Sequence, residues 1–199
     1  MANNYGDHLS DEELVALCQE RLPGDPRPFS ALVSRYQERV MATCLRLMGN
    51  KPEAEDQAQE VFIRVYRGIR NFQGRAKFST WLFQIAVNTC RTALKKRDRR
   101  LRLKQNLLSD PEILFSPASP LEEAALVQAE TGMVTQALQM LSEEERVILT
   151  LRETDGLSYQ EIADTLDIGL SAAKMRVMRA RLALKHAYQT LEKRHDPLG

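Results

Sequence analysis

Apolar residues recur at spacings of three and four along most of the chain, which is the period of an α-helix that buries one face. The alternation of apolar and polar residues that is typical of strands is absent, and glycine and proline fall where the apolar stripes stop. The pattern therefore predicts an all-α protein. The two clearest stripes are Phe29, Leu32, Val33, Tyr36, Val40, Cys44, Leu47 and, after a break, Ala54, Ala58, Val61, Phe62, Val65, Ile69.

Start and stop signals place the helix boundaries. Ser10, Ser142 and Ser158 are each followed three residues later by a glutamate, which is the spacing of a capping box. Single serines at 79 and 171 are expected to cap two further helices, and Gly169 is expected to supply a turn with positive φ. The expected helices cover about 11–21, 28–48, 52–69, 79–102, 121–141, 143–154, 159–166 and 171–193.

Residues 157–181 have the pattern of a helix-turn-helix, in which a short helix and a tight turn precede a second helix rich in lysine and arginine. Ala173, Val177 and Ala180 form the apolar face of that second helix. A basic surface on an ordinary helical hairpin would share some of these features. Five basic residues in twelve, beside a strictly apolar face, favour a helix that enters the major groove of DNA.

The charges are segregated, although the formal net charge is only +1. Seven Lys or Arg stand between Lys95 and Lys104, and seven more between Ser171 and Arg194, whereas residues 105–145 hold eight acids and no cation. Two basic blocks therefore flank an acidic one and predict two phosphate-contacting surfaces. Because prolines cluster in the acidic stretch, we expect a linker at 103–121 between two small helical domains, at 1–102 and 122–199.

Two helix faces in the first domain are polar. The first combines acids, an amide and Ile63, and suits either solvent or a docked protein. The second carries an aromatic, two amides and two cations, a mixture that suits unpaired DNA bases and phosphates, although a buried Trp81 beside solvated neighbours explains the same spacing equally well. The first face is Asp56, Gln59, Glu60, Ile63; the second is Trp81, Gln84, Asn88, Arg91, Lys95, preceded by a loop with Phe72, Arg75, Lys77.

Catalytic and metal chemistry find no support in the sequence. Cys18, Cys44 and Cys90 are far apart and form no Cys-x-x-Cys pair, and the three histidines do not cluster with them. We find no nucleophile–base pair and no phosphate loop, so we expect no enzyme, no metal and no cofactor. The reduced cysteines and the lack of a long apolar run favour a cytoplasmic protein without membrane insertion.

Three stretches together resemble the bacterial extracytoplasmic-function (ECF) sigma factors of RNA polymerase. Residues 53–62 (EAEDQAQEVF) are similar to the family's "AEDxxQEVF" segment, and residues 78–88 (FSTWLFQIAVN) to its "FxTWLxxIAxN" segment. Residues 157–181 resemble its C-terminal "LSYxEIAxxL…KxRxxRAR" segment. The resemblance spans about Phe29 to Leu191 and implies two helical domains, a sigma2-like and a sigma4-like one.

The resemblance also implies partners and roles. Core RNA polymerase would dock on Asp56, Gln59, Glu60, Ile63. The −10 promoter element would be opened and held as a single strand by Phe72, Arg75, Lys77, Trp81, Gln84, Asn88, Arg91, Lys95. The duplex −35 element would be read by Ser171, Lys174, Arg176, Arg179, Arg181, and an anti-sigma factor would mask these surfaces. Asp167 stands where the family usually has glycine in the turn, a position where aspartate tolerates left-handed geometry.

Two other functions compete with this hypothesis. A stand-alone helix-turn-helix regulator would use the first domain for dimerisation or ligand sensing and would bind duplex DNA without polymerase. A helical interaction protein with no DNA role would leave the basic block of Lys95 to Lys104 unexplained. The polar face with Trp81 and Asn88 argues against the regulator, since a sensor domain has no use for a single-strand surface.

Overall fold

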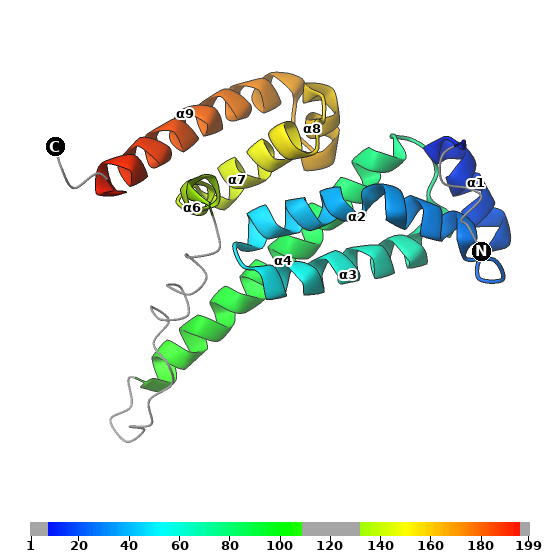
Figure 1. Ribbon diagram of the computed structural model, residues 1–199, viewed down its shortest axis with the longest axis horizontal. Helices are drawn as coiled ribbons and strands as arrows, with labels where there is room; N and C mark the ends of the chain where they lie inside the picture. The colour runs from blue at the N-terminus through cyan, green and yellow to red at the C-terminus, as the bar shows by residue number, and fades with distance from the viewer. Residues whose placement is uncertain (1–7, 109–131, 196–199) are drawn as a thin grey trace.

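The computed structural model describes residues 8–108 and 132–195, and these residues form helices joined by short connections (Figure 1). We call residues 8–108 the N-terminal unit and residues 132–195 the C-terminal unit. The N-terminal unit contains α1 (Asp11–Arg21), α2 (Arg27–Met48), α3 (Lys51–Gly68), the 3-10 turn η1 (Ile69–Asn71) and α4 (Phe78–Leu108). The C-terminal unit contains α6 (Met133–Gln139), α7 (Glu143–Leu149), the π-helical turn η2 (Thr150–Thr154), α8 (Tyr159–Leu166) and α9 (Leu170–His195).

The N-terminal unit is built on three long helices, because α2, α3 and α4 each turn an apolar stripe toward the others. Leu32 and Val40 of α2, Val61 of α3, and Leu82 and Phe83 of α4 are each at most 1% exposed. The shorter α1 packs against α2 and η1, across the end of the unit where α4 begins (Figure 1). The loop between η1 and α4 is therefore held against α1.

The C-terminal unit wraps three short helices and η2 around the long helix α9. Ala173, Val177 and Ala180 of α9 are fully buried, and they face Ile148 of α7 and Ile162 of α8 in one apolar core. The predicted apolar face of the second basic helix is thereby confirmed. Asp167 ends α8 with φ 53° and ψ 52°, and it turns the chain toward α9.

The three predicted capping boxes are confirmed. The side chains of Ser10, Ser142 and Ser158 each accept a hydrogen bond from the backbone N–H of a glutamate three residues on, and that glutamate side chain binds back to the serine N–H. These reciprocal bonds satisfy N–H groups that a helix start leaves without partners. The predicted end of the second helix at Gly49 is also confirmed, with φ 82° at that glycine.

Four local predictions are wrong. Ser79 and Ser171 do not cap helices, because α4 begins at Phe78 and α9 at Leu170, which leaves both serines inside the first turn. The left-handed turn residue is Asp167 rather than Gly169, whose φ is not positive. The fourth helix continues to Leu108, into the first residues of the expected linker, and the remainder of that linker lies outside the described residues.

The two units contact each other along one side of the N-terminal bundle. α2 contacts α6, α7 and η2, and α4 contacts α8. Within the described ranges, no helix is both long and apolar enough to span a membrane. All three cysteines are buried and free, and the sulfur atoms of Cys44 and Cys90 lie 3.7 Å apart between α2 and α4.

Candidate nucleic-acid interface

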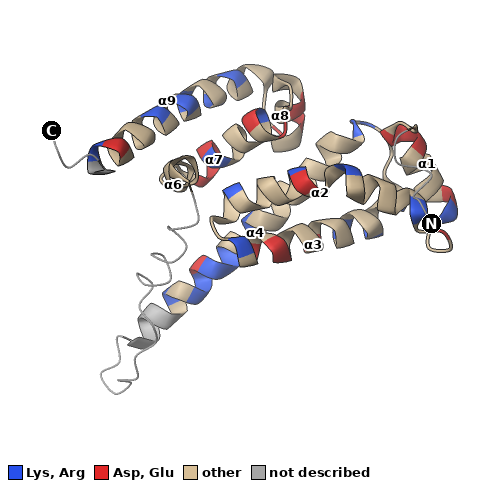
Figure 2. Cartoon of the chain, viewed as in Figure 1, with Lys and Arg blue, Asp and Glu red and all other residues tan. Residues whose placement is uncertain are grey.

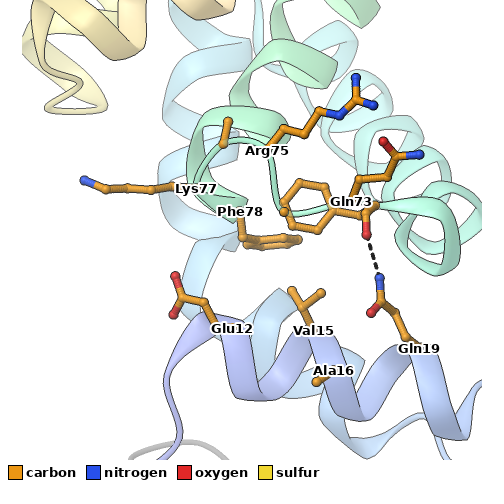
Figure 3. Close-up of a pocket in the computed structure, with 11 residues that line it drawn as sticks. Glu12, Val15, Ala16, Gln19, Gln73, Arg75, Lys77 and Phe78 are labelled. Atoms are coloured by element: carbon orange, nitrogen blue, oxygen red, sulfur yellow. Dashed lines mark hydrogen bonds between the residues drawn. The ribbon is translucent and has the colours of Figure 1, made fainter.

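The loop of residues 72–77 forms one wall of a cavity of about 520 Å³ at the start of α4 (Figure 3). Val15 and Gln19 of α1 lie on the opposite wall, and Phe78 closes the base. Gln19 fixes the loop, because its side-chain amide donates hydrogen bonds to the carbonyls of Ile69 (3.0 Å) and Phe72 (2.8 Å). The loop therefore has a defined shape and leaves an open, partly apolar hollow beside two exposed cations, Arg75 and Lys77.

Trp81 packs within the protein, although it belongs to the predicted polar face. Its ring lies 4.9 Å from the ring of Phe72 and 6.0 Å from that of Phe78. A side chain at Gly68 would come within 3.1 Å of the Trp81 ring, so the glycine leaves the space that the indole fills. Trp81 is thus a half-buried side chain that supports the loop.

The other members of this face differ in exposure. Asn88 and Lys95 are exposed, whereas Gln84 and Arg91 are half-buried. Arg91 forms an ion pair of 2.9 Å with Glu143 of the C-terminal unit. The structure therefore places all five predicted residues along one side of α4, but only Asn88 and Lys95 are fully open to a ligand.

The second predicted face, on α3, is largely open. Asp56, Gln59 and Ile63 are exposed, and Ile63 keeps 44% of its surface accessible although it is apolar. Glu60 is half-buried and pairs with Arg64 one helical turn away, at 2.7 Å. In Figure 1, α3 lies on the opposite side of α2 from the C-terminal unit, so this face stays uncovered.

The helix-turn-helix is formed by α8 and α9. Ser171, Lys174, Arg176, Arg179 and Arg181 are all exposed, and Figure 2 marks basic positions along α9. Two of them already contact acids of the same unit, since Arg176 lies 3.7 Å from Glu144 and Arg181 lies 2.6 Å from Glu153. Lys174 and Arg179 form no ion pair with the described residues and are the most available cations near the start of this helix.

A buried acid links the two units. Asp155, directly after η2, is 4% exposed, and its carboxylate accepts a hydrogen bond of 2.7 Å from the hydroxyl of Thr43 on α2. The guanidinium of Arg39 donates to the Asp155 carbonyl and lies 4.9 Å from the centre of the Phe83 ring. Burial raises the pKa of Asp155 to about 7, although the Thr43 hydrogen bond and the charge of Arg39 oppose that shift.

A surface ion pair joins the loop to the helix-turn-helix. The ammonium of Lys77 lies 2.9 Å from the carboxylate of Glu161 on α8, which raises the pKa of Lys77. The backbone hydrogen bond from Ser158, assisted by Lys77, lowers the pKa of Glu161 to about 2. Two of the predicted −10 residues, Lys77 and Arg91, are thus paired with acids of the C-terminal unit.

Sequence reasoning missed several residues that shape this site. Gln19 and Glu12 line the cavity from α1, and no spacing in the sequence connects them to a loop more than fifty residues away. Asp155 stands in a polar stretch, Glu153 to Gly156, that gives no sign of burial. A helical period shows which residues of one helix face inward, but it does not show which helix they meet.

Two family descriptions match the chain. Residues 32–100 match Sigma-70 region 2, and residues 131–184 match Sigma-70 region 4. The first match covers α2 to most of α4, with the loop of residues 72–77 inside it. The second covers the helix-turn-helix and the helices that support it.

Curated relatives match nearly the whole chain. The chain is 38% identical to the RNA polymerase sigma-H factor of Pseudomonas aeruginosa, over 91% of this chain and 95% of that protein. It is 34% identical to the ECF RNA polymerase sigma-E factor of Escherichia coli K12, over 94% of this chain and 99% of that protein. The matches therefore include both units and the residues between them.

Two solved structures share the fold. CnrH, in complex with the cytosolic domain of CnrY, superposes with a TM-score of 0.65 at 22% identity, over 90% of this chain and 97% of its own. The sigma factor RpoE of Bartonella quintana, in complex with the anti-sigma factor NepR, gives 0.62 at 24% identity, over 81% and 96%. With the matches to both sigma regions and the full-length relatives, these findings establish that the chain belongs to the ECF family of RNA polymerase sigma factors.

Proposed function

We propose that this chain binds core RNA polymerase and directs it to a set of promoters, where it recognises a −35 and a −10 element and helps to open the DNA. The observation that carries the proposal is the presence, in one chain, of a sigma region 2 with an open hollow at the start of α4 and a sigma region 4 with an exposed basic helix. The polymerase supplies the catalysis, and this subunit selects the promoter. Its place of action is then the cytoplasm.

The three sets of site residues divide this work. Asp56, Gln59, Glu60 and Ile63 form a mixed acidic and apolar surface on α3 that suits a protein partner, the polymerase. The loop and the start of α4 hold an unpaired base. Stacking of that base on the aromatic side chains of the hollow offsets the few kcal/mol that its unstacking from the duplex costs. Lys174, Arg176 and Arg179 read the edges of bases in the major groove, since they stand near the start of α9.

Reconstitution tests the proposal directly. Purified chain, a bacterial core polymerase and a pool of promoter fragments are scored for run-off transcripts whose start depends on the chain. We expect such transcripts, and their start sites should lie downstream of shared −35 and −10 sequences. Binding of duplex DNA by the chain alone, with no dependent transcript, would instead support the stand-alone regulator.

Two substitutions separate the roles of the regions. Asn88→Ala should slow open-complex formation while leaving the affinity for core polymerase unchanged, with exposed Thr92→Ala one turn later as a matched control. Arg176→Ala should lower promoter affinity by about 1–3 kcal/mol if its guanidinium reads a base, with Lys185→Ala further along α9 as its control. Equal losses of core binding in both variants would contradict this assignment.

We further propose that an anti-sigma factor holds the chain inactive. Both structural neighbours are in complex with another protein: CnrH with the cytosolic domain of CnrY, and the sigma factor RpoE with the anti-sigma factor NepR. A free sigma factor with open polymerase- and DNA-binding faces would also initiate transcription indiscriminately. A pull-down from the native cells that returned core polymerase but never a second regulator would contradict this proposal.

A further inference from the structure

The polar face of α4 does not end at Lys95. Arg99 and Arg102 follow it at spacings of four and three, the same rhythm that joins Asn88, Arg91 and Lys95. At 100° per residue all five side chains leave the helix within a sector of about 80°. With a rise of about 1.5 Å per residue, Arg102 stands about 21 Å beyond Asn88 along a single uninterrupted helix.

The distal cations on this face have no partner among the residues that the structure describes. Lys95, Arg99 and Arg102 are exposed, and they form no hydrogen bond or ion pair with the residues that the structure describes. Arg97 differs, because it points to another side, is half-buried and pairs with Glu53 at 2.9 Å. Figure 2 shows the basic segment of α4 extending past the end of α2 and α3, away from the loop and from α8.

The chemistry of this strip fits a nucleic-acid backbone. Lys95 to Arg102 spans about 10 Å along α4, a length over which one DNA strand advances by about three phosphates along the duplex axis. No aromatic side chain interleaves with the cations, so the strip offers charge without the stacking that unpaired bases need. Duplex phosphates therefore suit it better than a single strand does.

We propose that Lys95, Arg99 and Arg102 form a phosphate-binding track for the duplex DNA that adjoins the −10 element on its upstream side. The inference rests on the proposed function, which places the opened strand at the loop and the −35 element upstream. The track continues the face that carries Asn88, so the DNA that leaves this face passes along the same side of the helix. Its contacts fix the register of the DNA and carry no sequence preference.

The test compares two variants that each remove two charges from the same exposed part of α4. Arg99→Gln with Arg102→Gln alters the track, whereas Lys96→Gln with Arg100→Gln alters a face about 110° away and serves as the control. All four side chains are exposed, and glutamine is nearly as good a helix former as lysine or arginine, so both variants should fold. Each is assembled with core polymerase on a promoter fragment from the run-off experiment.

We expect the track variant to lower promoter affinity about tenfold at low salt and to reduce the slope of log K against log salt by about two, since about one counterion is released per phosphate contact. The control should leave both quantities unchanged. On a fork fragment whose duplex stops at the upstream edge of the −10 element, wild type and track variant should bind equally.

Four results would overturn the inference. Equal losses in both variants would indicate a diffuse charge effect, and a loss that persists on the truncated fork would place the contact elsewhere. Weaker assembly with core polymerase would indicate that the strip docks on protein. If the wild-type chain drives no promoter-dependent transcript at all, the proposed function fails, whereas normal transcription with unaffected variants refutes the track alone.

Discussion

The two halves of α4 carry the same polar face into different surroundings. In the first half, from Phe78 to Leu94, the opposite side of the helix is buried in the core, and Arg91 pairs with an acid of the C-terminal unit. In the second half, from Lys95 to Arg102, the helix leaves the bundle, and the cations on this face contact only solvent among the described residues. The comparison teaches that neighbours, rather than residue type, decide whether a cation is available to DNA.

The difference has an energetic side as well. Phe83 in the first half is fully buried, and its ring meets Tyr36 and the guanidinium of Arg39. Leu101 in the second half keeps 46% of its surface exposed. The packing of the core therefore fixes the position of the first half, whereas the second half contributes little to the core.

The largest expected effect is on the buried half. Phe83→Ala should lower the free energy of unfolding by about 3–5 kcal/mol, because it leaves a cavity between α2 and α4 and removes the ring on which Arg39 rests. Leu101→Ala should change it by less than about 0.5 kcal/mol. Urea denaturation followed by circular dichroism measures both, and a comparable loss in the two variants would contradict the division of the helix.

The next effect concerns the acid that links the units near this buried half. Because burial raises the pKa of Asp155 from 3.8 to about 7, the packed state binds more protons than the open chain between these values, and its stability falls as the pH rises from about 4 to 7. Asp155→Asn removes this penalty while its amide oxygen still accepts from Thr43. The variant should therefore be more stable than wild type at pH 8, by at most about 4 kcal/mol, and this difference should shrink to about 1 kcal/mol at pH 4.5.

Thermal unfolding between pH 4.5 and 8 measures this prediction, and small-angle scattering at the same pH values reports whether the units separate. The radius of gyration of the wild type should rise with pH, and that of Asp155→Asn should stay constant. Asp164→Asn, an exposed acid on α8, is the control and should follow the wild type. Parallel pH curves for all three proteins would show that Asp155 is not the linking acid.

A smaller effect is expected at the loop. Gln19→Leu keeps the apolar packing of α1 but removes both hydrogen bonds to the loop carbonyls, and we expect a loss of about 1–3 kcal/mol in loop stability. Open-complex formation should slow while core polymerase affinity is unchanged. Glu12→Gln lines the same cavity without contacting these carbonyls and should behave like wild type. Faster hydrogen exchange confined to residues 69–77 would confirm the cause.

The sequence predicts the helices well where two residues cooperate and poorly where one acts alone. Ser10, Ser142 and Ser158 have a glutamate three residues on, and all three cap as predicted. Ser79 and Ser171 have Leu82 and Lys174 at that position, so no side chain returns the hydrogen bond, and both helices begin one residue earlier. A lone serine therefore carries far less information than the pair.

Contacts between helices, unlike helix starts, could not be predicted from the sequence. Thr43 and Asp155 are more than a hundred residues apart, and neither interrupts the periodicity of its own segment. Trp81 lies on the polar face by spacing, yet it fills the space that Gly68 leaves, a fact that only the packing of α3 on α4 reveals. The resemblance to a family predicted the polymerase- and DNA-binding surfaces, whereas the ion pairs that Lys77 and Arg91 form with the C-terminal unit required the structure.

The smallest expected effect tests whether the ion pair with Glu161 limits the binding of DNA by Lys77. Glu161→Gln keeps the capping box, because glutamine can bind back to Ser158, but it removes the negative charge beside Lys77. Affinity for a single-stranded −10 oligonucleotide should rise a few-fold at low salt and return to the wild-type value at high salt, since exposed ion pairs are screened. Glu153→Gln, whose partner Arg181 lies in the same unit, is the control. If Lys77→Gln abolishes the gain in affinity, the Lys77 ammonium released from Glu161 is the source of that gain. If the gain persists, Glu161 acts through the general electrostatic field of α8, and its ion pair does not keep Lys77 from binding DNA.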